Sequence, residues 1–237
     1  MTDPVRRNSL LKALPPEERR ALAPHLETVH LARGTVLAEA GAVLGYVHFP
    51  HDGVVSSTLT MREGGTTEIA TIGREGMVGF FAVLGDHQAI ARNMVQIPGP
   101  ALRLPFEALQ DAFEASPRIR QICLRYVAAL VAHILQSAAC NARHDVEARL
   151  ARWLLLLQDR IDGVAALPLT QELVAEKLGV QRTTITMAAQ ALQRAGLIAY
   201  KWGSVTVLDR AGLEQAACEC YGAIRTRYER LLARPHG

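Results

Sequence analysis

Residues 169–209 read LTQELVAEKLGVQRTTITMAAQALQRAGLIAYKWGSVTVLD, and this stretch decides the interpretation of the whole chain. Thr170 precedes an apolar run at helical spacing, and its hydroxyl can accept a hydrogen bond from an N–H of the first helical turn. Gly179 follows the last apolar position, where a residue without Cβ can take the left-handed conformation that ends a helix. The stretch therefore predicts a helix, a tight turn and a second helix.

The second helix is predicted to begin near Gln181–Thr183 and to have two distinct faces. One face is apolar, with positions three and four apart: Ile185, Ala188, Ala189 and Leu192. The opposite face is polar and suits base edges and phosphates: Arg182, Thr183, Thr186 and Gln190. After Gly196, two short β-prone runs at 197–200 and 205–208 predict a hairpin with its turn at Trp202–Ser204.

The charge of this region suits nucleic acid. No Asp or Glu occurs from Lys177 through Leu208, whereas this window contains Lys177, Arg182, Arg194 and Lys201. Residues 1–142 hold 13 basic and 13 acidic residues and residues 143–237 hold 13 and 10, so the net charge of +3 lies in the C-terminal part. A helical hairpin that only packs in a core is the alternative. The coincidence of two helices, a hairpin and charge of one sign favours a winged helix–turn–helix that binds DNA.

The N-terminal half has a different pattern. From about Val29 to Leu104, short β-branched runs alternate with glycine-containing turns, which predicts an antiparallel barrel or sandwich. Residues 9–26 are expected to form short helical pieces that pack against it. A short helix is predicted at Phe106–Glu114, a supporting helix at Asp145–Ile161 and a closing helix at Ala211–Leu232.

A long helix is predicted from the Ser116-Pro117 cap to about Asn141. It carries two apolar rows. The first consists of Leu124, Val127, Val131, Ile134 and Ala138, and the second of Ile119, Ile122, Tyr126, Ala129, His133, Gln136 and Cys140. The second row repeats every seven residues, so we expect its members from Ile119 to His133 to form the seam of a dimer while the first row faces the β-domain. A helix that is simply buried on two sides would give the same pattern.

Short strands, a long helix and a winged helix–turn–helix, in this order, resemble the Crp/Fnr family of bacterial transcription regulators. The resemblance covers almost the whole chain. It is most specific in DVEARLARWLLLL at 145–157, in LTQELVAEKLGVQRTTITMAAQALQRAGLI at 169–198 and in VTVLDR at 205–210, whereas GREGMVGF at 73–80 matches by its glycines. It implies an α+β fold with an N-terminal antiparallel β-roll (a cyclic-nucleotide-binding-like jelly roll) at 1–115, a dimerisation helix at 116–141 and a winged helix–turn–helix domain at 142–237.

The resemblance also implies a homodimer that regulates transcription on a two-fold symmetric operator in double-stranded DNA, with RNA polymerase as a partner. It assigns base reading to Arg182, Thr183, Thr186 and Met187, and phosphate contacts to Thr170, Gln171, Gln181 and Thr184. The family often has a glutamate and an arginine where this chain has Thr183 and Met187. Threonine and methionine favour a thymine methyl group rather than cytosine or guanine, so we expect an operator that differs from the family's best-known consensus.

The resemblance places a candidate effector pocket in the β-roll. Relatives that bind cyclic nucleotides use a glycine and a glutamate, then an arginine and a small hydroxyl residue, with further hydroxyls from the long helix. The corresponding residues here are Gly79, Phe80, Arg92, Asn93, Ile134 and Leu135. Buried phosphate and ribose groups need polar partners, so we do not expect classical binding of cyclic AMP. The effector is left unknown, and the alternatives are a cyclic-nucleotide-responsive regulator or a sensor that acts mainly through protein contacts.

The cysteines and histidines show no familiar ligand motif. Four cysteines, at positions 123, 140, 218 and 220, are sparse and fit a reducing cytoplasm. An iron–sulfur cluster needs about four thiolates within reach, and the spacing here differs from the family's N-terminal cluster motif, so we do not expect one. Cys218 and Cys220 could form a redox pair or bind a metal, but we interpret them as buried thiols without a metal. His48, His51, His87 and His133 lack a spacing such as HExxH, so we expect neither haem nor metal.

No catalytic constellation is visible, since the chain has no G-x-S-x-G and no Walker loop. No uninterrupted apolar run approaches the length needed to cross a bilayer, and the N-terminus does not read as a signal peptide. We therefore predict a cytoplasmic regulator without enzyme activity and without a membrane partner.

Overall fold

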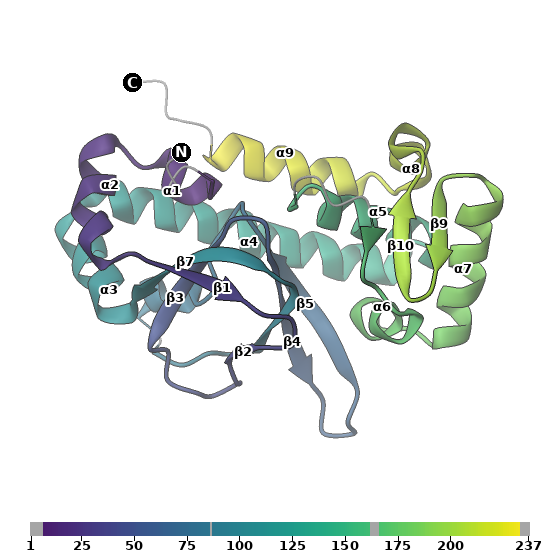
Figure 1. Ribbon diagram of the computed structural model, residues 1–237, viewed down its shortest axis with the longest axis horizontal. Helices are drawn as coiled ribbons and strands as arrows, with labels where there is room; N and C mark the ends of the chain where they lie inside the picture. The colour runs from purple at the N-terminus through teal and green to yellow at the C-terminus, as the bar shows by residue number, and fades with distance from the viewer. Residues whose placement is uncertain (1–6, 86, 162–165, 233–237) are drawn as a thin grey trace.

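The computed structural model describes residues 7–85, 87–161 and 166–232. A single long helix, α4 (Pro117–Arg143), runs along the molecule, with the N-terminal strands packed on one side of it. The C-terminal domain lies at one end of α4, and the last helix, α9 (Cys220–Leu232), returns alongside α4 towards the N-terminal helices (Figure 1).

The N-terminal domain is an antiparallel β-roll, as predicted. Two short helices and a 3₁₀ turn precede it: α1 (Ser9–Ala13), α2 (Pro16–Leu22) and η2 (Ala23–His25). One sheet has the order β1-β7-β3, formed by β1 (Glu27–Leu31), β7 (Gly99–Pro105) and β3 (Tyr46–Pro50). The other has the order β2-β6-β4-β5, formed by β2 (Val36–Ala38), β6 (Arg92–Ile97), β4 (Val54–Thr60) and β5 (Thr66–Ile72). A 3₁₀ segment, η3 (Phe80–Leu84), and α3 (Phe106–Ala115) connect the roll to α4.

The glycines of the segment GREGMVGF explain how α4 is held against the roll. A Cβ on Gly76 would lie 2.3 Å from the hydroxyl oxygen of Tyr126, so only glycine allows the tyrosine ring of α4 to pack here. The Tyr126 hydroxyl donates to the Met77 carbonyl oxygen at 3.1 Å and is fully buried. This contact fixes which side of α4 faces the β-roll.

The predicted dimer seam is consequently on the wrong side of α4. Its five residues, Ile119, Ile122, Tyr126, Ala129 and His133, are all buried inside the chain, where α4 packs against α9, the β-roll and the helices α1 and α3. The exposed apolar row consists instead of Leu124, Ala128, Val131, Leu135 and Ala138, which are four, three, four and three positions apart. Four of these residues had been given another role: Leu124, Val131 and Ala138 were predicted to face the β-domain, and Leu135 was a candidate for the effector pocket. The heptad-like spacing of the buried row reflects intramolecular packing.

By length and composition alone, α4 could cross a membrane, although polar residues interrupt its apolar sequence. Its apolar character has another explanation in the fold, since Tyr126, Ala129 and Leu130 are fully buried against the rest of the chain. We interpret α4 as the core helix of a globular protein.

The C-terminal domain has the predicted winged helix–turn–helix order. Its elements are α5 (Val146–Gln158), β8 (Ala166–Leu167), α6 (Gln171–Leu178), α7 (Arg182–Arg194), β9 (Ile198–Lys201), β10 (Ser204–Val207) and α8 (Arg210–Ala216). The three strands form an antiparallel sheet of order β8-β10-β9. The closing helix expected at Ala211–Leu232 is two helices, α8 and α9, because Ala217 adopts an extended conformation and ends the first.

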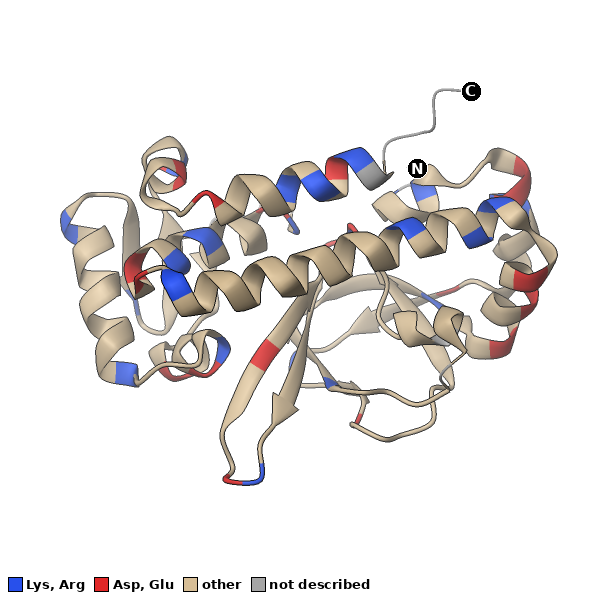
Figure 2. Cartoon of the chain, turned by 180° about the vertical axis from the view of Figure 1, so that it is seen from behind, with Lys and Arg blue, Asp and Glu red and all other residues tan. Residues whose placement is uncertain are grey.

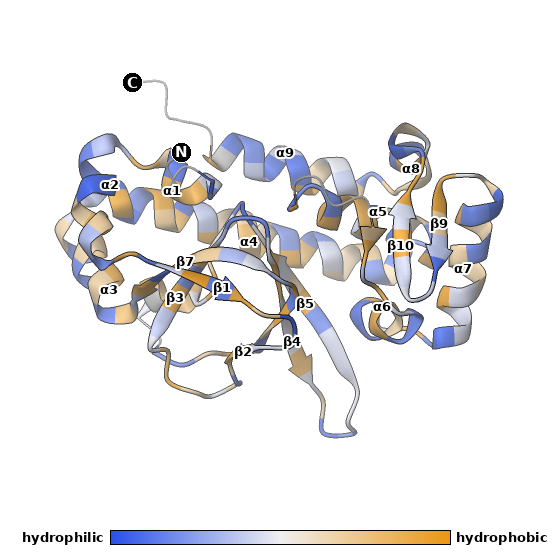
Figure 3. Cartoon of the chain, in the orientation of Figure 1, coloured by the Kyte–Doolittle hydropathy of each residue, from blue (hydrophilic) through white to orange (hydrophobic). Residues whose placement is uncertain are grey.

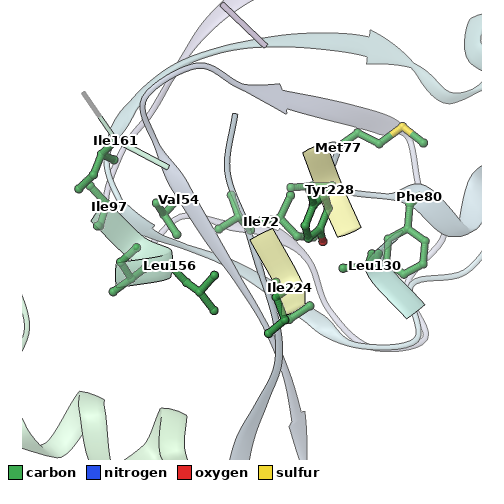
Figure 4. Close-up of a cluster of buried hydrophobic side chains, with 14 of the residues drawn as sticks. Val54, Ile72, Met77, Phe80, Ile97, Leu130, Leu156, Ile161, Ile224 and Tyr228 are labelled. Carbon is green, nitrogen blue, oxygen red and sulfur yellow. The ribbon is translucent and has the colours of Figure 1, made fainter. Parts of the chain in front are cut away.

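One hydrophobic core joins the two domains. Figure 4 shows Ile72 of β5, Leu130 of α4 and Leu156 of α5 in the same cluster as Ile224 and Tyr228 of α9. The outward side of α9 is largely hydrophilic (Figure 3), so these two apolar residues are the side on which it packs. The boundaries at 115 and 141 stay a prediction, since the core is continuous across them.

Polar contacts reinforce this junction. The Arg160 side chain, after α5, donates to Glu75 at 2.8 Å; Arg160 is buried and Glu75 is partly buried. The Trp153 indole of α5 donates to Glu68 of β5 at 3.0 Å. A partly buried ion pair and a partly buried hydrogen bond therefore connect the β-roll to α5, the helix that supports the winged helix–turn–helix.

Candidate nucleic-acid interface

The helix–turn–helix is built by the caps that its sequence predicts. The Thr170 hydroxyl accepts from the Leu173 N–H at 3.2 Å and caps α6. Gly179 has φ +63° and ψ +41°, the left-handed conformation that ends α6, and the Val180 N–H donates to the Ala175 carbonyl oxygen at 3.1 Å. Both cap predictions are confirmed, and together they set the sharp turn between α6 and α7.

The two faces of α7 are also as predicted. Ile185, Ala188, Ala189 and Leu192 are buried. On the opposite face Arg182, Thr183 and Met187 are exposed, and the Met187 side chain is 67% exposed although it is apolar. Thr186 is half-buried. The face assigned to base reading is therefore open to solvent, and its apolar member is available for a contact outside the chain.

Two side-chain contacts connect the predicted reading face to α6. Arg182 forms an ion pair with Glu172 at 2.8 Å, and both side chains are largely exposed. The Thr186 hydroxyl lies 2.8 Å from Gln171 Oε1 and 3.1 Å from the Arg182 carbonyl oxygen, so it can donate to either. Glu172 was missed by the sequence analysis because it lies just outside the acid-free window.

The predicted phosphate contacts surround the start of α6 and α7. Thr170 and Gln181 are exposed, and Gln171 and Thr184 are half-buried. Gln181 is the N-cap residue of α7 but makes no side-chain cap hydrogen bond. An N-terminus without a side-chain cap can direct its backbone N–H groups and its positive dipole at an anion such as a phosphate.

The wing ends in an exposed aromatic residue. Lys201 pairs with Ser204, and the two residues between them, Trp202 and Gly203, have positive φ angles of 53° and 74°, the pattern of a type I′ hairpin turn. The Trp202 side chain is fully exposed. A Cβ on Gly203 would lie 3.5 Å from the Thr170 side chain, so the wing turn is adjacent to the start of α6. The sequence located the turn but assigned no role to its tryptophan.

A partly buried tyrosine holds the wing against the helix–turn–helix. The Tyr200 hydroxyl donates to the Leu169 carbonyl oxygen at 2.6 Å. Burial, with a smaller contribution from Glu172, raises the pKa of Tyr200 to about 12. The hydroxyl therefore keeps its proton and this hydrogen bond at physiological pH.

The positive charge of the interface comes from fewer residues than the sequence suggests. Lys177 is buried, and its Nζ lies 3.3 Å from Glu176 Oε1, so it does not face phosphates. Arg182, Arg194 and Lys201 are exposed. Basic residues mark the two ends of α7, and no acidic residue occurs along it (Figure 2).

The six residues of the candidate effector pocket do not assemble into one polar site. Phe80 is buried, with its ring 3.9 Å from that of Phe81 and edge-on to Tyr126. Arg92 pairs with Glu39 at 3.3 Å, and buried Asn93 accepts from Ser57 at 2.8 Å.

The other three members do not supply the missing polar groups. Gly79 has φ +88° and would place a Cβ 3.1 Å from Val47. Ile134 packs against the core, whereas Leu135, the next residue of α4, is 65% exposed. The apolar ring of Phe80 therefore lies at the position where, by the family resemblance, a carboxylate would bind the ribose of a cyclic nucleotide.

Two family models match the chain. A cyclic nucleotide-binding domain matches residues 28–116, and a Crp-like helix-turn-helix domain matches residues 148–216. Among curated proteins, the fumarate and nitrate reduction regulatory protein of Vibrio cholerae is 25% identical over 199 residues, which are 79% of this chain and 77% of that protein. The global nitrogen regulator of Synechococcus elongatus is 23% identical over 202 residues, 80% of this chain and 89% of that protein.

Solved structures share the fold. FixK2 from Bradyrhizobium japonicum matches with a TM-score of 0.70 at 14% identity and covers 81% of this chain and 98% of its own. The Crp/Fnr-family regulator TTHA1359 from Thermus thermophilus matches with a TM-score of 0.65 at 23% identity, over 81% of this chain and 98% of its own.

Proposed function

Since the chain belongs to the Crp/Fnr family of transcription regulators, we propose that it acts as a homodimer that binds a two-fold symmetric operator in double-stranded DNA. The exposed, acid-free face of α7 beside the wing is the observation that carries this proposal. A helix of this kind fits the major groove, while the start of α6 and the wing meet the phosphates on either side.

The reading residues favour a particular kind of operator. The Arg182 guanidinium can fork onto the O6 and N7 atoms of a guanine. Thr183 and Met187, both exposed, suit contact with thymine methyl groups. Half-buried Thr186 contributes by holding Gln171, which lies where a phosphate contact is expected. We propose half-sites that combine one arginine-read guanine with neighbouring A·T pairs.

The exposed row of α4 supplies the dimer seam in this proposal. Leu124, Val131 and Leu135 are exposed apolar side chains, and the other two positions of the row are alanines. A heptad-spaced stripe of this kind buries itself against a copy of the same helix. Paired α4 helices would present two copies of α7 to half-sites one helical turn apart.

The β-roll serves as the sensor domain in this proposal, but not through classical recognition of a cyclic nucleotide. Phe80 is part of the core and cannot bind a ribose hydroxyl, and α4 offers Ile134 and Leu135 where hydroxyl residues are needed. The regulator would act in the cytoplasm, where its contacts with operator DNA and RNA polymerase occur.

DNA selection followed by fluorescence anisotropy tests the function. The full-length chain should select a palindromic sequence from random duplexes, bind it far more tightly than a scrambled duplex, and lose affinity steeply as salt rises. Weak binding that does not depend on salt would overturn the proposal. It would favour instead a sensor that acts through protein contacts.

A further inference from the structure

Four potential metal ligands meet where α4 ends and α9 begins. Cys140 and His144 are four positions apart at the end of α4, so both lie on one side of the helix. Cys218 lies in the break between α8 and α9, 78 residues after Cys140, and Cys220 is the first residue of α9. The three sulfur atoms and an imidazole nitrogen all lie within 4.8 Å of one another.

The distances fit a single tetrahedral ion. Cys140 Sγ lies 3.5 Å from Cys218 Sγ, and Cys220 Sγ lies 3.6 Å from His144 Nδ1. Around a tetrahedral zinc ion, two thiolate sulfurs are about 3.8 Å apart, and a sulfur and a nitrogen about 3.6 Å. A disulfide would need about 2.05 Å between sulfurs, and an iron–sulfur cluster would hold its thiolates farther apart because irons and sulfides lie between them.

Neighbouring polar groups orient these ligands. The Glu219 carboxylate lies 3.2 Å from His144 Nε2 and so directs the other ring nitrogen, Nδ1, toward the sulfurs. The Gln136 amide donates to Cys220 Sγ at 3.0 Å. A carboxylate behind a histidine and an N–H donor on a sulfur are the supports that metal ligands commonly have.

The surrounding charge also calls for an anion. Arg149 and Arg152 are buried and interact electrostatically with Cys140 and Cys218. In the part of the chain that the structure describes, neither forms an ion pair, and the Nε atom of each has no hydrogen-bond partner. Buried cations without a counter-charge are costly. Three thiolates and Zn²⁺ carry a net charge of −1, which would offset part of this positive charge.

We propose that Cys140, His144, Cys218 and Cys220 bind a structural Zn²⁺ ion. Three thiolates and one imidazole in tetrahedral array favour zinc, and four protein ligands leave no open position for catalysis. This replaces the sequence-based interpretation of Cys218 and Cys220 as thiols without a metal. The ligands were hidden because they come from distant segments and because the break between α8 and α9 was not foreseen.

The ion fastens α9 at its first turn. From there α9 carries Ile224 and Tyr228 into the shared core, and the Tyr228 hydroxyl lies 3.4 Å from His133 Nδ1 on α4. His144 is also the C-cap residue of α4, directly before Asp145, which caps α5. The site therefore stabilises the junction between the proposed dimerisation helix and the DNA-binding domain.

Metal analysis of the full-length chain tests this proposal without reference to DNA. Protein purified under reducing conditions and given Zn²⁺ should retain one equivalent per chain after desalting. Titration of the metal-free chain with Co²⁺ alone should give the visible bands of tetrahedral cobalt and a sulfur-to-cobalt charge-transfer band. His144→Asn and Cys220→Ser should lose the bound zinc, whereas Cys123→Ser, at a buried cysteine in the main core, should retain it.

Co²⁺ titration of the unchanged chain keeps the proposal testable even if a cysteine variant fails to fold. Absence of tetrahedral cobalt bands in the folded, reduced wild-type chain would overturn it. Zinc retained in full by His144→Asn and Cys220→Ser would also overturn it, as would a Cys140–Cys218 disulfide in freshly isolated protein. Zinc bound with the expected ligands would stand even if DNA binding failed, so the two proposals can be separated.

Discussion

Replacement of Arg182 by alanine gives the sharpest test of the proposed reading face. The structure separates its effect on folding from its effect on DNA. Arg182 pairs with Glu172 at 2.8 Å, but the two side chains are 63% and 70% exposed, so the pair stabilises the fold by at most about 1 kcal/mol. Arg182 also lies at the first position of α7, where a positive charge opposes the helix dipole. We therefore expect Arg182→Ala to leave the thermal midpoint nearly unchanged.

Binding should change much more. A bidentate contact between Arg182 and guanine is worth about 1–3 kcal/mol, so Arg182→Ala should raise Kd for the selected operator by about 5- to 150-fold. For a scrambled duplex the rise should be smaller, so the ratio of the two Kd values should fall. Fluorescence anisotropy with both duplexes at one salt concentration measures this ratio.

Glu172→Gln is the matched variant. This variant frees Arg182 from an ion pair that DNA binding must break, and it removes a negative charge near the phosphates. We therefore expect the Kd for the operator to stay the same or to fall by at most about fivefold. An equal loss of affinity on both duplexes in Arg182→Ala, with the salt slope reduced by about 0.9, would show that Arg182 touches only a phosphate. That result would refute the assignment of Arg182 to base reading.

Three further perturbations test the proposed dimer, the domain junction and a buried histidine. Leu135→Glu should convert the proposed dimer to a monomer in sedimentation velocity, whereas Val43→Glu, at an exposed apolar residue outside α4, should not. A dimer that persists in Leu135→Glu would exclude the exposed row of α4 as the dimer interface. Glu75→Ala should lower the free energy of unfolding, measured in urea, by about 3–5 kcal/mol because it leaves the buried Arg160 without its ion-pair partner. Glu17→Ala, in an exposed ion pair, should lower it by less than about 1 kcal/mol, and equal losses in the two variants would contradict the prediction. Burial, and to a smaller extent the charge of Arg103, lowers the pKa of His48 to about 4, so the folded chain resists protonation of this imidazole. The free energy of unfolding should therefore fall by up to about 3 kcal/mol as the pH drops from about 6.5 toward 4. His48→Gln should reduce this loss, and equal stability of the wild-type chain at pH 7.5 and pH 5 would contradict the prediction.

The parts of the fold that the sequence predicted best are those set by local chemistry. Thr170 and Gly179 cap α6 through interactions within a few residues, and the two faces of α7 follow from a helical period. A hairpin turn was likewise marked by Gly203, which has a positive φ. Such features need no knowledge of what else packs nearby, so one sequence suffices to predict them.

Apart from the break between α8 and α9, the errors concern contacts between distant segments. Tyr126 and His133 fall on a heptad row, but the first fills the space left by Gly76 and the second contacts Tyr228 of α9, so the row faces inward. Lys177 looked like part of a phosphate-binding surface because its burial against other elements is invisible to a charge count. Periodicity shows that a helix has an apolar side, but it does not show whether this chain or a second copy covers it.

The contacts between distant segments also constrain how a signal in the β-roll can reach DNA. Glu68 of β5 accepts hydrogen bonds from Ser56 and Thr71 within the roll and from Trp153 of α5, so one carboxylate belongs to both domains. Ile72, at the end of β5, lies in the same core as α5, so a shift of β5 must either disrupt its packing against α5 or carry α5 with it. α5 in turn packs against α7, and α9 returns to close the same core. A domain that swings on a free linker does not fit this arrangement, so we expect the β-roll and the DNA-binding domain of one chain to move together. In the proposed dimer, regulation would then act where the two α4 helices meet.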